Sequence, residues 1–170
     1  MIMPVPAYMT IEGATQGDIS GGACSADSIG SLSKGSHEDE IMVQSFTGDI
    51  IVPKDPQSGQ PSGQRIHEGF SITKIFDKSS PLLYQALSTG EQLKTVVLKW
   101  FRTSPTGEQE HYFTIEAKEA TITGIKTHMP NCLDPKNSCF THMEEVSFSY
   151  KDITWTHEVA GTSGADSWNN

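Results

Sequence analysis

Two alternating segments joined by a turn decide the fold of this chain. Thr95–Arg102 reads TVVLKWFR, and Tyr112–Lys118 reads YFTIEAK. Every second residue from Val96 to Trp100 is apolar, which places these side chains on one face of an extended strand. Between the two segments, the proline and glycine of Ser104–Gly107 (SPTG) suit a tight turn. The stretch therefore predicts an antiparallel β-hairpin with one buried face.

Further strands are predicted on both sides of this hairpin. They are Ala7–Ile11, Ile41–Phe46, Asp49–Val52, Ile66–Ile75, Thr121–Lys126, Val146–Tyr150 and Ile153–His157. The last two segments carry their apolar residues at even and at odd positions, respectively, and this change of parity predicts a bulge or tight turn at Lys151–Asp152. Thr15–Ser36 is rich in glycine and serine and is predicted to be a surface excursion with little regular structure.

One short helix is predicted over about residues 80–89. Ser80 can cap its N-terminus, Pro81 suits the first helical position, and Gly90 suits the left-handed residue after its end. Apolar residues between them recur at a spacing of four, so the helix can lay one face on a sheet. About eight strands and one helix predict a mostly β chain, a single domain over 1–170, with a β-barrel of two packed antiparallel sheets.

Composition excludes several classes of protein. The 170 residues carry 12 basic and 21 acidic side chains, and a net charge of −9 repels nucleic acid and anionic lipid surfaces. No apolar run approaches the roughly 20 residues that a membrane helix needs, so membrane insertion is not expected. Met1–Pro6 contains no basic residue and no signal-peptide core, so we expect folding in the cytoplasm, or exit by a route that needs no signal peptide.

A cluster of histidines and cysteines is the sharpest local pattern. His128, Cys132, Cys139 and His142 lie within fifteen positions, and zinc accepts such ligands. The six-residue gap between the cysteines is not a zinc knuckle, however, so a polar loop is the favoured interpretation and no metal is predicted. A disulfide between Cys132 and Cys139 after export is favoured over zinc, which leaves Cys24 as a free, buried thiol.

No other motif predicts catalysis or a cofactor. His37–Glu40 (HEDE) lacks the second histidine of a metalloprotease helix and is interpreted as a solvated strand entry. The serine in Gly59–Gly63 lies one position too late for a nucleophile elbow, and glycine-rich phosphate loops are absent from the sequence. His67, His111 and His157 lie in or beside strands, where a hydrogen-bonded structural role is expected. Catalytic, cofactor-binding and metal-binding residues are therefore predicted to be none.

One loop is longer than its place in the fold requires. It contains three prolines, two glycines and no large apolar side chain, and a hairpin needs only two to five loop residues. The prolines favour an extended, polyproline-like geometry. Long loops of this kind are usually functional or disordered, so a mobile loop without a partner is the alternative. The residues are Pro53, Lys54, Asp55, Pro56, Gln57, Ser58, Gly59, Gln60, Pro61, Ser62, Gly63 and Gln64.

Several stretches, spread from about Ala7 to Trp168, resemble the Hcp family (haemolysin-coregulated protein), the inner-tube protein of the bacterial type VI secretion system. The matching stretches are Ala23–Gly30 (ACSADSIG), His37–Glu40 (HEDE), Val52–Pro53, Asp55–Arg65 (DPQSGQPSGQR), Ser80–Tyr84 (SPLLY), Leu98–Trp100 (LKW), Ile153–Trp155 (ITW) and Gly161–Trp168 (GTSGADSW).

The resemblance implies a structural subunit that forms homo-hexameric rings. In the family the rings stack into a tube, contraction of a sheath expels the tube, and small effector proteins travel in the lumen. The implied partners are further copies of the chain, the sheath, spike and baseplate proteins, and the effectors. The implied location is cytoplasmic before firing and extracellular afterwards. By analogy with the family, loop 53–64 is expected to project from the ring face and to make ring-to-ring contacts.

The resemblance defines no catalytic residues, and because the sequence ends at Asn170, soon after the expected barrel, we expect no appended toxin domain. Composition alone also allows a free-standing β-sandwich binding module, lectin-like or pilus-like, which would be monomeric. An enzyme is the third alternative, and it depends only on the cluster of histidines and cysteines.

Overall fold

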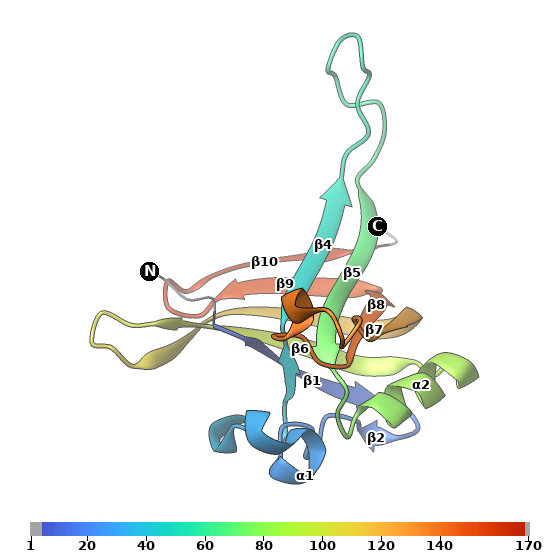
Figure 1. Ribbon diagram of the computed structural model, residues 1–170. Helices are drawn as coiled ribbons and strands as arrows, with labels where there is room; N and C mark the ends of the chain where they lie inside the picture. The colour runs from blue at the N-terminus through green and yellow to red at the C-terminus, as the bar shows by residue number, and fades with distance from the viewer. Residues whose placement is uncertain (1–4, 169–170) are drawn as a thin grey trace.

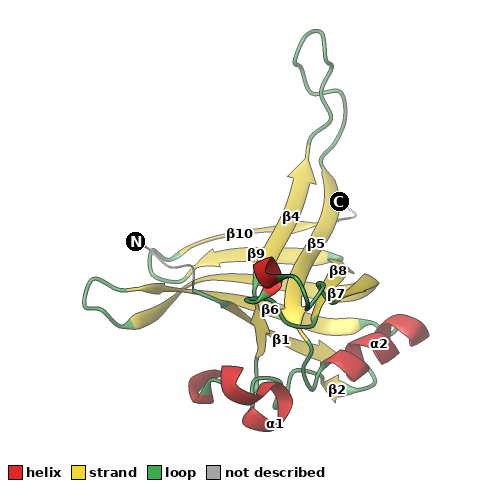
Figure 2. Cartoon of the chain, viewed as in Figure 1, coloured by secondary structure: helices red, strands yellow, loops and turns green. Residues whose placement is uncertain are grey.

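Ten strands dominate the computed structural model, which describes residues 5–168 (Figure 1, Figure 2). They are β1 (Ala7–Gly13), β2 (Gly17–Asp18), β3 (Ile41–Val43), β4 (Ser45–Ile51), β5 (Ile66–Ile75), β6 (Leu93–Thr103), β7 (Gln109–His128), β8 (Met143–Ser149), β9 (Asp152–His157) and β10 (Thr162–Ser167). The α-helices are α1 (Ala26–Ile29) and α2 (Ser80–Thr89), and 3₁₀ turns cover Gly30–Leu32, Gly35–His37 and Pro135–Asn137.

The prediction of a mostly β, antiparallel fold is confirmed. Positions 1–4 and 169–170 lie outside the described residues. They include the start of the chain that was considered above for a signal peptide and both ends of the predicted 1–170 domain.

A single sheet contains the ten strands and folds over, so that β4 and β5 cross β9 and β10 steeply (Figure 1). Its main path runs β2–β1–β6–β7–β8–β5–β4, with β3 beside β1 and the pair β9–β10 beside β7. The 20-residue strand β7 belongs to both halves of the folded sheet, because its first half pairs with β6 and β9 and its second half pairs with β8. Over the described residues the ladder is not closed into a ring, so the expected barrel of two sheets is one open, folded sheet.

Two of the predicted strands have different boundaries. Ile41–Phe46 divides at Gln44, whose backbone N–H donates to Thr73 O at 2.8 Å as the chain passes from β3 to β4. Asp49–Val52 is not a separate strand, because β4 continues past a β-bulge as far as Ile51. Residues 41–52 thus form a nearly continuous extended segment, which pairs first with β1 and then with β5.

Strand β7 unites the predicted strands Tyr112–Lys118 and Thr121–Lys126. Strands β8 and β9 follow one another along β7, and between them the Lys151 N–H donates to Lys118 O at 3.2 Å. Glu119, in this stretch of β7, has a positive φ of 50°. The parity change is therefore absorbed by a local irregularity, as predicted. The short strands β2 and β10 were not predicted, because neither shows apolar alternation.

The core lies between the folded halves of the sheet. Leu98 and Val146 are fully buried there, and α2 adds Leu83 and Ala86. These two are one residue from each pair predicted at a spacing of four, while their partners Leu87 and Leu82 are half-buried against the core. Burial of one such aliphatic side chain contributes about 1.5–3 kcal/mol to stability. The helix ends as predicted, since Gly90 has a left-handed φ of 67°.

The start of α2 rests on a buried ion cluster. Lys74 is fully buried, and its Nζ contacts Asp77 Oδ1 at 3.1 Å and Glu144 Oε1. Ser80 is not the capping residue that the sequence predicted, because the N-cap position falls on Ser79. The Ser80 hydroxyl instead donates to Glu144 Oε1 at 2.6 Å and helps to satisfy this buried carboxylate.

The excursion Thr15–Ser36 is more regular than predicted, because it contains β2, α1 and a 3₁₀ turn. Its start is fixed by Glu91, whose carboxylate accepts the backbone N–H groups of Thr15 and Gln16, each at 2.7 Å.

None of the helices within residues 5–168 is long and apolar enough to cross a membrane.

Candidate assembly surface

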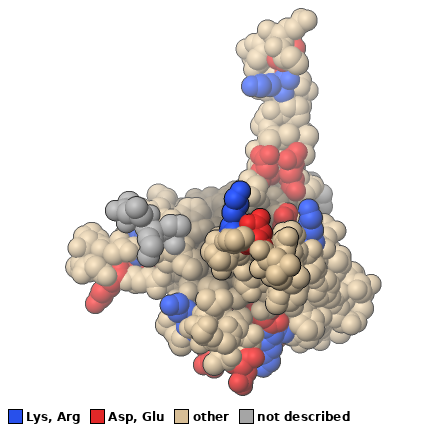
Figure 3. All heavy atoms as spheres, viewed as in Figure 1, with Lys and Arg blue, Asp and Glu red and all other residues tan. Residues whose placement is uncertain are grey.

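Loop 53–64 forms the tip of a hairpin, built by β4 and β5, that stands clear of the rest of the molecule (Figure 1, Figure 3). All of its residues except the half-buried Pro53 are exposed, so the structure brings every predicted loop residue onto this one projection. Acidic side chains gather where the hairpin leaves the body (Figure 3).

The loop is a small hairpin with its own hydrogen bonds, rather than the extended polyproline-like segment that was predicted. Two backbone hydrogen bonds join its two sides, Ser62 N–H to Pro53 O and Asp55 N–H to Gln60 O, each at 2.8 Å, and together they form the bridge that pairs Lys54 with Pro61. The prolines do not interrupt this pattern, because Pro53 contributes only its carbonyl oxygen and neither bond requires an N–H from Pro61.

Asp55 organises the turn at the very tip. Its Oδ1 accepts the Gln57 N–H at 3.0 Å, and its Oδ2 accepts the Ser58 hydroxyl at 2.9 Å. These hydrogen bonds, the one from Gln57 first, hold the pKa of Asp55 below its usual value. Gly59 completes the turn with a φ of 71°, a conformation that favours glycine.

An apolar neck lies between the polar tip and the body. We define the neck as Ile50, Ile51, Val52 and Ile66, whose side chains are 39–50% exposed. Ile51 and Ile66 are directly paired across β4 and β5. Successive side chains of a strand point to opposite faces, so the Ile51–Ile66 pair and Ile50 expose apolar surface on both faces of the hairpin. Sequence reasoning missed this surface, because an aliphatic run in a strand is normally covered by a second layer, and here the strands extend beyond it.

The hairpin bends where it leaves the body. The pairing of β4 with β5 shifts between Gly48 and Ile50, which marks a β-bulge. Opposite this bulge, Gly69 has a φ of 78°, and a Cβ atom placed on it would lie 2.2 Å from Phe148 O. Only glycine fits such a conformation and such a close backbone approach.

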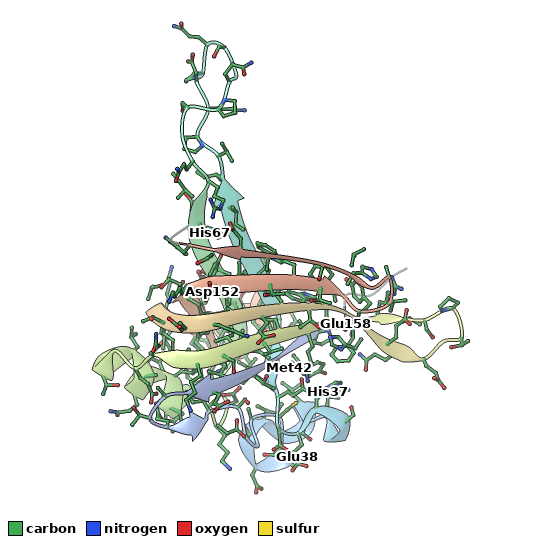
Figure 4. All side chains as sticks on the ribbon, turned by 180° about the vertical axis from the view of Figure 1, so that it is seen from behind. His37, Glu38, Met42, His67, Asp152 and Glu158 are labelled. Carbon is green, nitrogen blue, oxygen red and sulfur yellow. The ribbon has the colours of Figure 1, made fainter. Side chains whose placement is uncertain are left out.

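A polar cluster fixes the base of the hairpin to the C-terminal strand, and Figure 4 labels its His67 at this base. The Asp166 carboxylate accepts from Arg65 Nε and from Arg65 Nη2, the latter at 2.7 Å, and contacts His67 Nε2 at 2.8 Å. His67 is buried, its Nδ1 lies 2.8 Å from the Tyr150 hydroxyl, and Trp168 stacks on its ring at 5.5 Å. We call these five residues the base clamp.

The base clamp also shifts the pKa values of Asp166 and Tyr150. Hydrogen bonds from Arg65 and then from His67 hold the pKa of Asp166 well below its usual value. Burial, followed by the nearby Asp166 charge, raises the pKa of Tyr150 to about 12. Local patterns gave no signal for this clamp, because Arg65 and His67, at the start of β5, lie about a hundred positions from Asp166 on β10.

The predicted cluster of histidines and cysteines lies around the loop between β7 and β8. Cys132 and Cys139 are free and exposed, and the His142 ring lies 5.8 Å from Phe76. Within residues 5–168, no group of three or more His, Cys, Asp or Glu side chains is placed to hold a metal ion. The buried Cys24 is confirmed, and burial raises the pKa of its thiol.

The segment His37–Glu40, which was predicted to be solvated, differs from that prediction at one residue. Glu38 and Asp39 are exposed as expected, but His37 is buried and stacks on Tyr8 with ring centroids 3.7 Å apart. Its Nδ1 contacts Glu40 at 3.1 Å, so it is part of the packing between the excursion and β1.

The structural roles of the other histidines are confirmed. His67 belongs to the base clamp, His111 Nε2 lies 2.7 Å from the Thr114 hydroxyl, and His157 Nδ1 accepts the Ala160 N–H at 3.0 Å.

Comparison with known proteins places the chain in a family. The family model described as "Type VI secretion system effector, Hcp" matches residues 8–157. The "Major exported protein" of Pseudomonas aeruginosa is 55% identical over 166 residues, which cover 98% of this chain and 96% of that protein.

Solved structures agree with this match. A crystal structure described as "Hcp protein" superposes with a TM-score of 0.93 at 50% identity and covers 97% of this chain and 98% of the other. The "Secreted protein Hcp3" from Pseudomonas aeruginosa gives a TM-score of 0.83 at 46% identity, with coverage of 97% and 99%. The chain therefore belongs to the Hcp family of type VI secretion system proteins, as the resemblance predicted.

Proposed function

We propose that this type VI secretion protein works as a tube subunit whose projecting hairpin makes contacts between subunits through its neck and between rings through loop 53–64. Members of the Hcp family form ring-shaped oligomers of the secretion system. In this proposal six copies of the chain form one ring through a closed, heterologous interface, and the rings stack into the tube. The observation that carries the proposal is the projecting hairpin, with a polar tip, an apolar neck and a base clamp.

The chemistry of the hairpin suits two contacts. The neck presents four β-branched side chains to water, and covering them with a neighbouring subunit gains hydrophobic free energy. The tip presents loop 53–64, whose turn is pre-formed by its own hydrogen bonds, so that docking does not have to order it. We assign the neck to contacts between subunits and loop 53–64 to contacts between rings.

The remaining steps follow from the secretion machine. The chain is one non-catalytic domain that waits in the cytoplasm and is expelled when the sheath contracts. Sheath, spike and baseplate proteins are its partners in the machine, and small effector proteins occupy the lumen. A free-standing β-sandwich binding module shares the fold class, but the match over nearly the whole chain favours the tube subunit.

The assembly is tested by light scattering and electron microscopy of the purified chain. We expect a hexameric mass at micromolar concentration and rings with an open centre. A strictly monomeric mass across a concentration series, with the fold intact, would refute the proposed tube function.

The role of the loop is tested by replacing Lys54–Ser62 with a Gly-Asn linker. The melting temperature and the ring mass should stay close to those of the parent, because the change in loop-closure entropy is small and no core side chain is lost. Stacking and export should fall steeply. A same-length Gly/Ser replacement is the matched control for length, and it should fail as the short loop does. If the shortened protein is secreted and stacks as well as the parent, the loop has no role in assembly.

A further inference from the structure

Two of the three cysteines lie in the loop between β7 and β8, and the proposed tube function does not use them. Both Cys132 and Cys139 are exposed and carry free thiols, whereas Cys24 is buried. A relative of this chain is described as a major exported protein. Thiols that stay reduced in a cytoplasm meet an oxidising environment outside the cell. A pair of exposed thiols on an exported chain is therefore a candidate redox site.

The loop that carries these cysteines is folded back on itself. The carbonyl of Asn131, directly before Cys132, accepts a hydrogen bond from Asn137 Nδ2 at 3.1 Å. The carbonyl of Asn137 accepts the Phe140 N–H at 3.0 Å, in a turn that contains Cys139. The first contact holds Asn137, two residues before Cys139, beside Asn131, so the chain does not have to be closed from an extended form.

A small hollow of about 240 Å³ lies between the two sides of this loop. One side is lined by Met129, Pro130 and Cys132, and the other includes Ser138 and Phe140. Cys132 thus borders the same hollow as both chain neighbours of Cys139. Cys139 itself does not line the hollow, but its two neighbours along the chain do, so the backbone that carries Cys139 borders the same hollow as Cys132.

We propose that Cys132 and Cys139 form an internal disulfide after export, which closes the β7–β8 loop as a redox-sensitive clasp. The proposal rests on the export step of the proposed function. The oxidant is a small-molecule disulfide such as oxidised glutathione. One thiolate attacks this disulfide, releases one small thiol and forms a mixed disulfide. The second thiolate then attacks the protein sulfur and releases the second small thiol. The protein loses two hydrogens and two electrons, which the small disulfide gains.

Closure changes the loop in a reversible way. Exposed disulfides are more easily reduced than buried structural ones, so the clasp opens again in a reducing compartment. Leu133, which is 88% exposed, and Lys136 lie inside the closed ring. A closed ring restricts the local opening that a protease needs, so the clasp should protect the peptide bond after Lys136 from trypsin.

The test uses the full-length, folded protein in mixtures of reduced and oxidised glutathione, quenched with an alkylating reagent. Trypsin, applied after denaturation, cleaves after Lys126, Lys136 and Lys151, which puts the two cysteines on separate peptides. We expect these two peptides to be joined, and to outnumber glutathione adducts by roughly tenfold, because thiols on one short loop reach millimolar effective concentrations. Cys24 should remain alkylatable only after unfolding, since it is buried.

Single variants provide the matched controls. Cys132→Ser and Cys139→Ser should each accumulate the glutathione adduct on the remaining loop cysteine and show no joined peptides. Glutathione adducts on both cysteines of the parent, or a cross-link between chains in place of the internal one, would overturn the proposal. Ring mass is measured on the same samples, so that a failure of assembly is distinguished from a failure of the clasp.

Discussion

The glycine at the bend of the projecting hairpin makes the most exacting prediction. Replacement of Gly69 by alanine adds one methyl group at a φ of 78°, 2.2 Å from Phe148 O. Adopting a left-handed conformation costs a non-glycine residue about 1–2 kcal/mol. Pushing apart two backbone segments that are packed in a sheet costs about 1–3 kcal/mol more, by comparison with overpacked cores. The Gly69→Ala variant should therefore lose about 2–5 kcal/mol of unfolding free energy.

The matched control separates these two contributions. Gly161 has nearly the same φ, 75°, but a Cβ atom placed there meets nothing within 4 Å. Gly161→Ala should cost only the conformational part, about 1–2 kcal/mol. Denaturant unfolding at one protein concentration measures both variants, and for a chain of this size the excess loss at Gly69 corresponds to a melting temperature lower by roughly 2–12 °C. Equal losses in the two variants would refute the argument from close approach.

Three further predictions concern charge and thiol groups. Lys74→Met should lose about 3–5 kcal/mol of unfolding free energy, measured by denaturant unfolding, because it leaves buried carboxylates without their cation. Adding Glu144→Gln should restore part of this free energy. An unchanged stability of the single variant would contradict the prediction. The folded-state pKa of Asp166 is depressed, so its contribution is present above the unfolded pKa of about 4 and is lost as the pH falls below it. Asp166→Asn should therefore flatten the acid side of a melting-temperature profile, and an unchanged profile would count against the base clamp. The double change of Cys132 and Cys139 to Ser should move stability by less than about 0.5 kcal/mol under reducing conditions, since both are exposed; stoichiometric zinc in the purified parent would reveal a metal role.

The sequence predicts the parts of the fold that local periodicity controls. The alternation in Thr95–Arg102 gave β6, and the spacing of apolar residues before Gly90 gave α2. A parity change near Lys151 gave the break between β8 and β9. Prolines and glycines identified residues 53–64 as a long loop, because they cannot belong to a core element.

The features that local sequence patterns did not predict depend on residues far away in the sequence. The burial of His37 requires the ring of Tyr8, and the base clamp requires Asp166 to return to Arg65 from a hundred positions away. The exposure of the neck follows from the reach of the hairpin beyond the second layer, which an isolated aliphatic run such as Ile50–Val52 does not reveal.

Strand β7 has a mechanical consequence, since it belongs to both halves of the folded sheet. Its ladders with β6, β8 and β9 together run along its full 20 residues. A force applied along β7 stretches these hydrogen bonds in shear, so that many of them must fail at once. A force applied across the strand opens them one after another, at much lower tension. The subunit is therefore expected to be stiffest along β7, and a tube that is driven forward by contraction withstands the greatest thrust when β7 lies close to the axis of travel.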